Sequence, residues 1–151
     1  MSITQVLSRA VDVAYTHEDV RTAAQRMSAR RVGTLVVVDD FGKPIGMLTD
    51  RDLALRVVGL GWDVALTTVG DVMTPYPVVV TEHSPLERAL ALMRKHGVRR
   101  APVVGSHDRL IGMVSLDDIV RWLARQLSEV RRVLAATSPR RLAHVHPEVH
   151  T

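Results

Sequence analysis

The sequence predicts a mixed α/β (α+β) protein made of two tandem β-α-β-β-α repeats that pack around a pseudo-twofold axis. The second half of the chain matches the first at a constant shift of 66 residues, without a gap. Each half contains one apolar helical face, followed by two short apolar runs that flank a polar turn. A unit of about 60 residues buries too little apolar surface to be stable alone, so we expect the two units to share a core.

The matched positions keep both their hydrophobic class and their turn chemistry, which chance at a single shift would not sustain. We therefore infer a duplicated unit, with repeats at residues 3–60 and 69–126. The clearest matches are Met27 with Met93, Val37-Val38 with Val103-Val104, Ile45-Gly46-Met47 with Ile111-Gly112-Met113, Thr49 with Ser115, and Asp52 with Asp118.

In the first repeat, the β-rich run Val11–Tyr15 predicts a strand. A helix follows, because apolar residues recur at positions i, i+3, i+4 and i+7 from Val20 to Met27. The runs Leu35–Val38 and Ile45–Leu48 flank a polar turn and predict a hairpin, and a second helix begins after it. Glycines mark residues 59–70 as the link to the second repeat.

The second repeat shows the same order, with a strand at Val78–Thr81. In Ser84-Pro85-Leu86-Glu87, we expect the serine to cap a helix, the proline to take the first helical position and the glutamate to complete a capping box. Gly97 provides a left-handed stop for that helix. The runs Ala101–Val104 and Leu110–Val114 predict the second hairpin.

The final helix, from about Leu116 to Ser138-Pro139, continues beyond the repeat. Its apolar stripe predicts a partner surface, for which a homodimer is the simplest partner; packing on the chain's own core explains the stripe equally well. Residues 127–151 form this extension and a basic, histidine-containing tail. The residues of the stripe are Ile119, Val120, Leu123, Leu127, Val130 and Leu134.

Composition excludes several classes of protein. The chain has no cysteine, which excludes disulfide scaffolds, thiolate metal sites and cysteine nucleophiles. No apolar run is long enough to cross a membrane, and the opening residues lack the pattern of a secretory signal, so we expect a cytoplasmic protein without a membrane partner.

The net charge is +4, but residues 131–151 hold four arginines against one glutamate, which leaves the body nearly neutral. With only 3% aromatic residues, nucleic-acid binding is disfavoured, and the arginine tail is the one segment that could support it.

The residues that could bind a ligand follow each hairpin. Thr49 and Asp52, like Ser115 and Asp118, place a hydroxyl and a carboxylate where a strand ends and a helix begins. Free backbone N–H groups at such a helix start can hold a phosphate, and the aspartate can accept hydrogen bonds from ribose hydroxyls. The same spacing is also an ordinary helix-capping pattern, and a cap would be duplicated too.

The chain carries three further motifs, in this order: Asp71-Val72-Met73-Thr74-Pro75, then Val98-Arg99-Arg100-Ala101-Pro102-Val103-Val104, with a Gly-x-x-[Ser/Thr]-x-x-Asp segment in each repeat. Together they resemble the CBS domain family, specifically the tandem pair called a Bateman module. The resemblance covers approximately residues 3–126. It implies clefts between the repeats that bind AMP, ADP or ATP, with S-adenosylmethionine or NAD also possible, and a regulatory output through an associated protein. No cofactor is required.

The resemblance also assigns roles to residues. Asp52 and Asp118 would hold ribose hydroxyls, and Thr49 and Ser115 would contact phosphate or ribose. Adenine would lie against apolar side chains and backbone near Val13–Tyr15 and Val78–Thr81. The candidate positions in those two segments are Val13, Val79 and Thr81.

The two repeats differ where ligand choice is decided. The second has Arg99-Arg100 where the first has Gly33-Thr34, and Pro102 where the first has Val36. Because arginine pairs bidentately with phosphate, we expect the cleft reached by Arg99 and Arg100 to be the nucleotide site. Solvated surface arginines at a strand start would give the same sequence.

Other functions find less support in the sequence. No nucleophile elbow, phosphate-binding loop or zinc-protease motif occurs, so we expect no catalytic residues and no enzyme activity. The tail histidines His144, His146 and His150 indicate a polar end rather than a metal site. A structural dimerisation module with empty clefts remains the main alternative to a nucleotide sensor.

Overall fold

The computed structural model describes residues 2–138, and its fold is the predicted pair of repeats. Residues up to Ile119 form one compact unit, and the residues from Val120 onward form a second. The first repeat comprises β1 (Val13–Ala14), α1 (Val20–Arg30), β2 (Thr34–Val38), β3 (Pro44–Thr49), α2 (Asp50–Asp52) and its π-helical continuation η2 (Leu53–Val58). The second comprises α3 (Val69–Val72), β4 (Thr74–Pro75), β5 (Val80–Thr81), α4 (Leu86–His96), β6 (Arg100–Val104), the short turn η3 (Ser106–Asp108), β7 (Leu110–Ser115) and α5 (Leu116–Thr137).

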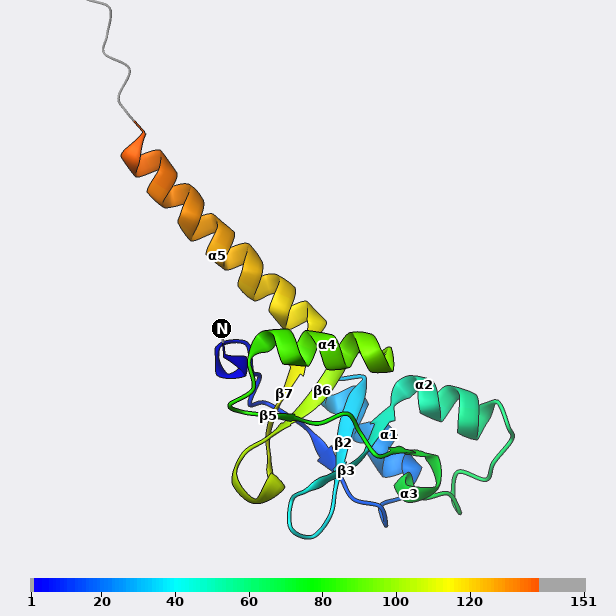
Figure 1. Ribbon diagram of the computed structural model, residues 1–151. Coiled ribbons are helices and arrows are strands. Elements are labelled where there is room, and N and C mark those ends of the chain that lie inside the picture. Colours follow the sequence, from blue (N-terminus) through cyan, green and yellow to red (C-terminus); the bar gives the residue numbers. More distant parts are fainter. Residues whose placement is uncertain (1, 139–151) are drawn as a thin grey trace, which may run out of the picture. The chain divides into compact units, whose positions relative to one another are not determined.

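The two sheets have the same internal arrangement, which confirms the duplication (Figure 1). In each, a short parallel strand lies beside the first strand of an antiparallel hairpin. The register of the two hairpins is also the same, since Val36 pairs with Met47 and the equivalent residues Pro102 and Met113 pair with each other. The hairpin tips lie together, where the Leu110 N–H donates to the Gly42 carbonyl at 2.9 Å.

The first segment of each repeat pairs through its backbone with the sheet of the other repeat. β4, near the start of the second repeat, pairs with β3 of the first. In return, Ser8 exchanges two backbone hydrogen bonds of 2.9 Å with Met113 in β7. The short helix α3 follows the same rule, because its Val69 and Val72 are fully buried in the core of the first repeat. The two repeats are therefore interlocked by backbone pairing as well as by side-chain packing.

Two equivalent glycines permit this close approach. A Cβ atom on Gly112 would lie 2.5 Å from the Ser8 carbonyl oxygen and would also meet the Leu7 side chain. A Cβ atom on Gly46 would meet the Met73 sulfur and lie 3.2 Å from the Thr74 carbonyl oxygen. Backbone cannot yield as a flexible methionine can, so Gly112 is the more demanding position.

The helices bury the faces that their apolar spacing predicts. In α1 these are Val20, Ala23 and Met27, and in α4 they are Leu86, Ala89 and Met93. Both helices end in a left-handed residue, at Arg31 with φ 55° and at Gly97 with φ 65°. The predicted stop at Gly97 is thus confirmed, while the first repeat places an arginine in the same conformation.

The predicted start of α4 is wrong by one residue. Pro85, not Ser84, occupies the cap position, and it provides no side-chain hydrogen bond. The Ser84 hydroxyl instead bonds the Thr81 hydroxyl at 2.8 Å. Asp19 stands at the equivalent position of the first repeat and caps α1 through the Thr22 N–H at 2.8 Å.

None of the helices in residues 2–138 combines the length and the hydropathy that spanning a bilayer requires. The predicted histidine tail, together with Arg140 and Arg141, lies outside the described residues.

We expect Gly112→Ala to lower the free energy of unfolding by about 1–3 kcal/mol, because the new methyl group meets backbone that is held in the exchanged pairing. Gly46→Ala is the matched comparison and should cost less, since the Met73 side chain can move. Urea unfolding followed by circular dichroism measures both. An equal loss of stability in the two variants would contradict this explanation of the close approach at Gly112.

Acid should weaken the anchoring of α3. Asp71 accepts hydrogen bonds from the Thr68 backbone N–H at 2.9 Å and the Thr68 hydroxyl at 2.8 Å, and these bonds lower the pKa of Asp71 below its ordinary value. A lowered folded-state pKa gives stability that is present above the unfolded pKa of 3.8 and is lost as the pH falls through the folded pKa.

The stability difference between the wild type and Asp71→Asn should therefore be constant near neutral pH and should shrink below about pH 4. Asp40→Asn, in the exposed turn between β2 and β3, removes a carboxylate that caps no helix and is the control. Urea unfolding at a series of pH values measures the difference. A difference that persisted unchanged to pH 2 would refute this role of Asp71.

Candidate functional site

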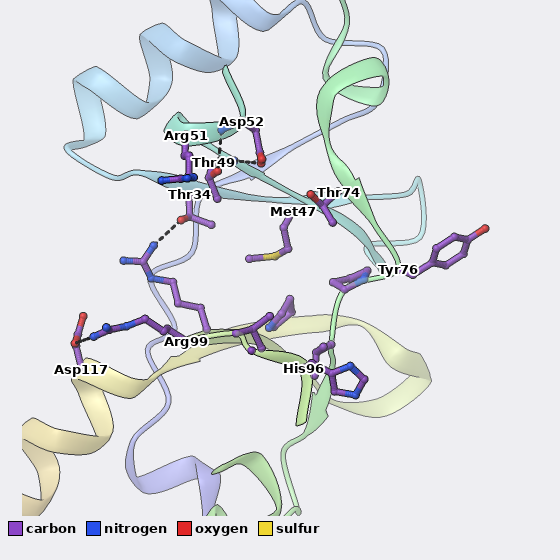
Figure 2. A pocket seen from close by; sticks show the side chains of 16 residues that line it. Thr34, Met47, Thr49, Arg51, Asp52, Thr74, Tyr76, His96, Arg99 and Asp117 are labelled. Atoms are coloured by element: carbon purple, nitrogen blue, oxygen red, sulfur yellow. Dashed lines mark hydrogen bonds and ion pairs between the residues drawn. The ribbon is translucent and has the colours of Figure 1, made fainter. Parts of the chain in front are cut away.

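A cleft of about 670 Å³ lies between the two repeats, within the compact unit. This volume falls in the range of about 300–1,000 Å³ that is usual for small-molecule sites. Figure 2 shows Thr49, Arg51 and Asp52 from the first repeat on one side, and His96, Arg99 and Asp117 from the second repeat on the other.

On the side of the first repeat, Thr49 and Asp52 form a reciprocal capping box. The Thr49 hydroxyl accepts from the Asp52 N–H at 3.1 Å, and one Asp52 carboxylate oxygen accepts from the Thr49 N–H at 2.9 Å. The motif of Thr49 and Asp52 therefore does cap the helix α2, as its spacing allowed. The cap uses only one of the two carboxylate oxygens of Asp52. The other lies 3.7 Å from the Arg56 guanidinium.

On the side of the second repeat, two arginines begin strand β6. Arg99 pairs with Asp117 at 3.2 Å, and both side chains are more than half exposed. Arg100 donates to the Thr34 hydroxyl at 2.7 Å. Thr34 and Arg100 occupy equivalent positions in the two repeats, so this bond lies at the pseudo-twofold axis. Together with Arg51, these arginines give the cleft three cationic side chains.

Arg56 connects β4, the strand that the second repeat adds to the sheet of the first, to the capping box of Thr49 and Asp52. It donates to the Val72 carbonyl at 2.6 Å and to the Thr74 hydroxyl at 3.2 Å, and its guanidinium lies 3.7 Å from Asp52. Sequence reasoning did not single out this residue. No motif marks it, because its partners lie 16 and 18 residues further along the chain.

The structure brings together half of the predicted site residues. Five of the ten line this cleft: Thr49, Asp52, Arg99, Arg100 and Pro102. The other five do not line it: Val13, Val79, Thr81, Ser115 and Asp118. Ser115 and Asp118 form the equivalent cap in the second repeat, where the Ser115 hydroxyl donates to the Asp118 carboxylate at 2.5 Å and accepts from the Asp118 N–H at 3.1 Å. The Val13 carbonyl accepts from Arg26 at 2.6 Å. A ligand role for these five stays a prediction.

The cleft also contains apolar residues that the sequence did not indicate, namely Met47, Pro77 and Val98. Val78 lines it as well and belongs to the segment Val78–Thr81 that was expected beside adenine. Tyr76 lies at the rim with a left-handed backbone, φ 55°, and with its ring pointing away from the cleft in Figure 2. Such a conformation is costly for a bulky residue, and strain of this kind gathers at functional sites.

Within residues 2–138, no group of three or more histidine, aspartate or glutamate side chains could hold a metal ion. The residues that line the cleft provide cationic, hydroxyl, carboxylate and apolar surface. This set of groups suits an anionic ligand with an apolar, planar part.

Comparison with protein-family models finds the CBS domain twice in this chain, at residues 3–59 and 69–125. Hypoxic response protein 1 of Mycobacterium tuberculosis is 33% identical over 138 residues, which cover 91% of this chain and 95% of that protein. The CBS domain-containing protein YhcV of Bacillus subtilis is 36% identical over 118 residues, 78% of this chain and 82% of that protein. An uncharacterized protein of Methanopyrus kandleri is 31% identical, and the match spans only 62% of its length.

Solved structures share the fold. A crystal structure of Hypoxic Response Protein I with two coordinated zinc ions has a TM-score of 0.72 and 31% identity, covering 80% of this chain and 98% of that one. The CBS domain pair of protein MJ0100, in complex with 5′-methylthioadenosine and S-adenosyl-L-methionine, also has a TM-score of 0.72, at 24% identity, covering 82% of this chain and 99% of that one.

We expect Arg56→Met to lower the free energy of unfolding by about 1–3 kcal/mol, because the Val72 carbonyl and the Thr74 hydroxyl lose a charged hydrogen-bond donor. Arg88→Met, on the exposed face of α4, is the matched control. Urea unfolding measures both variants. If the two substitutions had the same effect, Arg56 would not hold the exchanged strand in place.

Proposed function

Because the chain belongs to the CBS domain family, we propose that it is a regulatory module whose inter-repeat cleft binds an adenosine nucleotide and transmits the bound state to a partner protein. The observation that carries the proposal is the meeting of Asp52 and Thr49 from one repeat with Arg99 and Arg100 from the other, in one cleft of suitable volume. Relatives in this family include a domain pair whose structure holds adenosine compounds.

The arginines favour a ligand that carries phosphate. Arg99 is exposed, and its present partner Asp117 is exposed as well, so a phosphate can replace this carboxylate at little desolvation cost. Arg51 and Arg100 add two further cations. Guanidinium groups bind phosphate bidentately and more strongly than neutral donors do. We therefore expect AMP, ADP or ATP to bind better than methylthioadenosine, which has no phosphate.

The remaining groups of the cleft suit the nucleoside. The second carboxylate oxygen of Asp52 can accept hydrogen bonds from ribose hydroxyls while the first still caps the helix. Apolar surface for the base comes from Met47, Pro77, Val78 and Pro102. The proposal thus retains the capping role of Asp52 and adds a ligand role to it.

The proposal includes a homodimer in the cytoplasm and an output through an associated protein. The cysteine-free composition supports the compartment. Output through dimer geometry requires that the nucleotide bind one arrangement of the repeats better than another.

A thermal-shift experiment tests the proposal. A ligand that binds only the folded state adds about 2.7 kcal/mol at about 100 times its Kd, which raises the Tm by roughly 5–10 °C for a domain of this size. We expect AMP, ADP or ATP to produce such a shift and methylthioadenosine at the same concentration to produce a smaller one.

The ligand-induced shift, rather than the Tm itself, should fall in Asp52→Asn and in Arg99→Gln. Asp118→Asn is the matched control, because it stands at the equivalent position and does not line this cleft. If no adenosine nucleotide shifted the Tm, the alternative of a structural dimerisation module would replace the proposal. A shift lost only in Asp118→Asn would move the site to the other repeat.

A further inference from the structure

The part of α5 that follows the compact unit exposes many large apolar side chains. From Val120 onward it is a single helix that ends at Thr137, and no other described element belongs to this second unit. A lone helix cannot bury an apolar face within its own unit. Six large apolar side chains on it are between 42% and 69% exposed: Val120, Leu123, Leu127, Val130, Val133 and Leu134.

All of them except Val133 follow an alternating spacing of three and four. The steps from Val120 to Leu134 are three, four, three and four residues, and Leu116 and Thr137 extend the pattern at either end. This is the strict seven-residue repeat of a coiled coil, with Val120, Leu127 and Leu134 at its a positions and Leu123 and Val130 at its d positions. A helix that packs on a globular core has a broader apolar face, with a period of 3.6 residues.

The positions that flank the seam are compatible with self-association. Ala124 and Arg131 take the e positions, and Gln126 and Val133 take the g positions. In a parallel pair in register, Gln126 of one copy faces Arg131 of the other, so no like charges meet across the seam. The charged residues Arg125, Glu129 and Arg132 point to the outer side, where Arg132 and Glu129 form an ion pair at 2.8 Å.

The apolar area is sufficient for a weak specific interface. The five side chains at the a and d positions provide on the order of 500 Å² per helix, so a pair buries about 1,000 Å², near the lower limit of specific protein interfaces. An occupant with the same narrow stripe and the same length matches this surface best, and a second copy of the chain has both.

We propose that residues 120–137 pair with the same segment of a second copy as a short two-stranded coiled coil. The inference deepens the homodimer of the proposed function and rests on it for the copy number, but it does not depend on nucleotide binding. Because α5 begins at Leu116, next to the Asp117 that pairs with Arg99 in the cleft, the coiled coil continues the helix that starts at the ligand site.

Sedimentation equilibrium of the full chain tests the interface. Leu127→Asp places a charge at a central a position, and we expect it to raise the dimer Kd at least about tenfold, since the interface would have to bury an unpaired carboxylate. Ser128→Asp adds the same charge on the outer face and should leave the Kd within about twofold. An unchanged Kd in Leu127→Asp, or a monomeric wild type at tens of micromolar, would overturn the proposal.

A distance measurement separates this interface from one formed by the repeats. Because the chain has no cysteine, Arg125→Cys carries a single nitroxide label near the middle of the segment. Pulsed electron spin resonance should give a narrow distance of about 2–3 nm, which is the helix spacing of about 1 nm plus the reach of two outward labels. The narrow distance should vanish when Leu127→Asp is added. A broad distribution beyond about 4 nm in the dimer would also overturn the proposal, since labels on paired helices stay close.

Folding and ligand binding serve as internal controls. Leu127→Asp and Ser128→Asp should both keep the ADP-induced shift of Tm. If the ADP shift is absent from the wild type while the association and distances follow the pattern above, the nucleotide proposal fails and the coiled coil stands. If the shift is present and the Kd is unaffected by Leu127→Asp, the coiled coil fails alone.

Discussion

The reciprocal pairing of leading segments is the constraint on which the rest of the structure depends. β4 completes the sheet of the first repeat, and Ser8 pairs with the second sheet at the equivalent point. Backbone hydrogen bonds at these positions can form only when the two repeats are correctly placed, because the strands come from different halves of the chain. Gly46 and Gly112 leave the space for this approach. Duplication thus produced one interlocked unit from two halves that are each too small to be stable.

The cleft is a consequence of that interlocking. The segment that crosses from one repeat to the other carries Thr74, Pro77 and Val78 to the face where Thr49 and Asp52 begin a helix. Arg56 ties the crossing segment to that helix start, and Arg100 bonds Thr34 across the pseudo-twofold axis. A ligand in this cleft touches both repeats at once, and α5 begins beside it. The affinity for such a ligand therefore depends on how the two repeats are arranged.

Local patterns in the sequence were sufficient for the fold and insufficient for the site. Helices, hairpins and the left-handed stop at Gly97 follow from periodicity and glycine, and a gapless repeat predicts two matching sheets. The cap at Ser84 was wrong because its hydroxyl has a competing partner in Thr81, only three residues away. Motif spacing treats both aspartates alike, whereas in the structure Asp52 lines the described cleft and Asp118 does not, because that cleft draws on both repeats. Arg56 has no local signal, since its partners come from a segment that only the exchange brings near.

A crystal structure of the chain grown with ADP would test the central claim most directly. The account predicts electron density for the phosphates beside Arg99 and Arg100, with a ribose hydroxyl within hydrogen-bond distance of Asp52 and the base against Met47 and Pro102. Density for ADP at another place on the molecule, or a cleft without nucleotide in crystals grown with ADP in large excess, would contradict it.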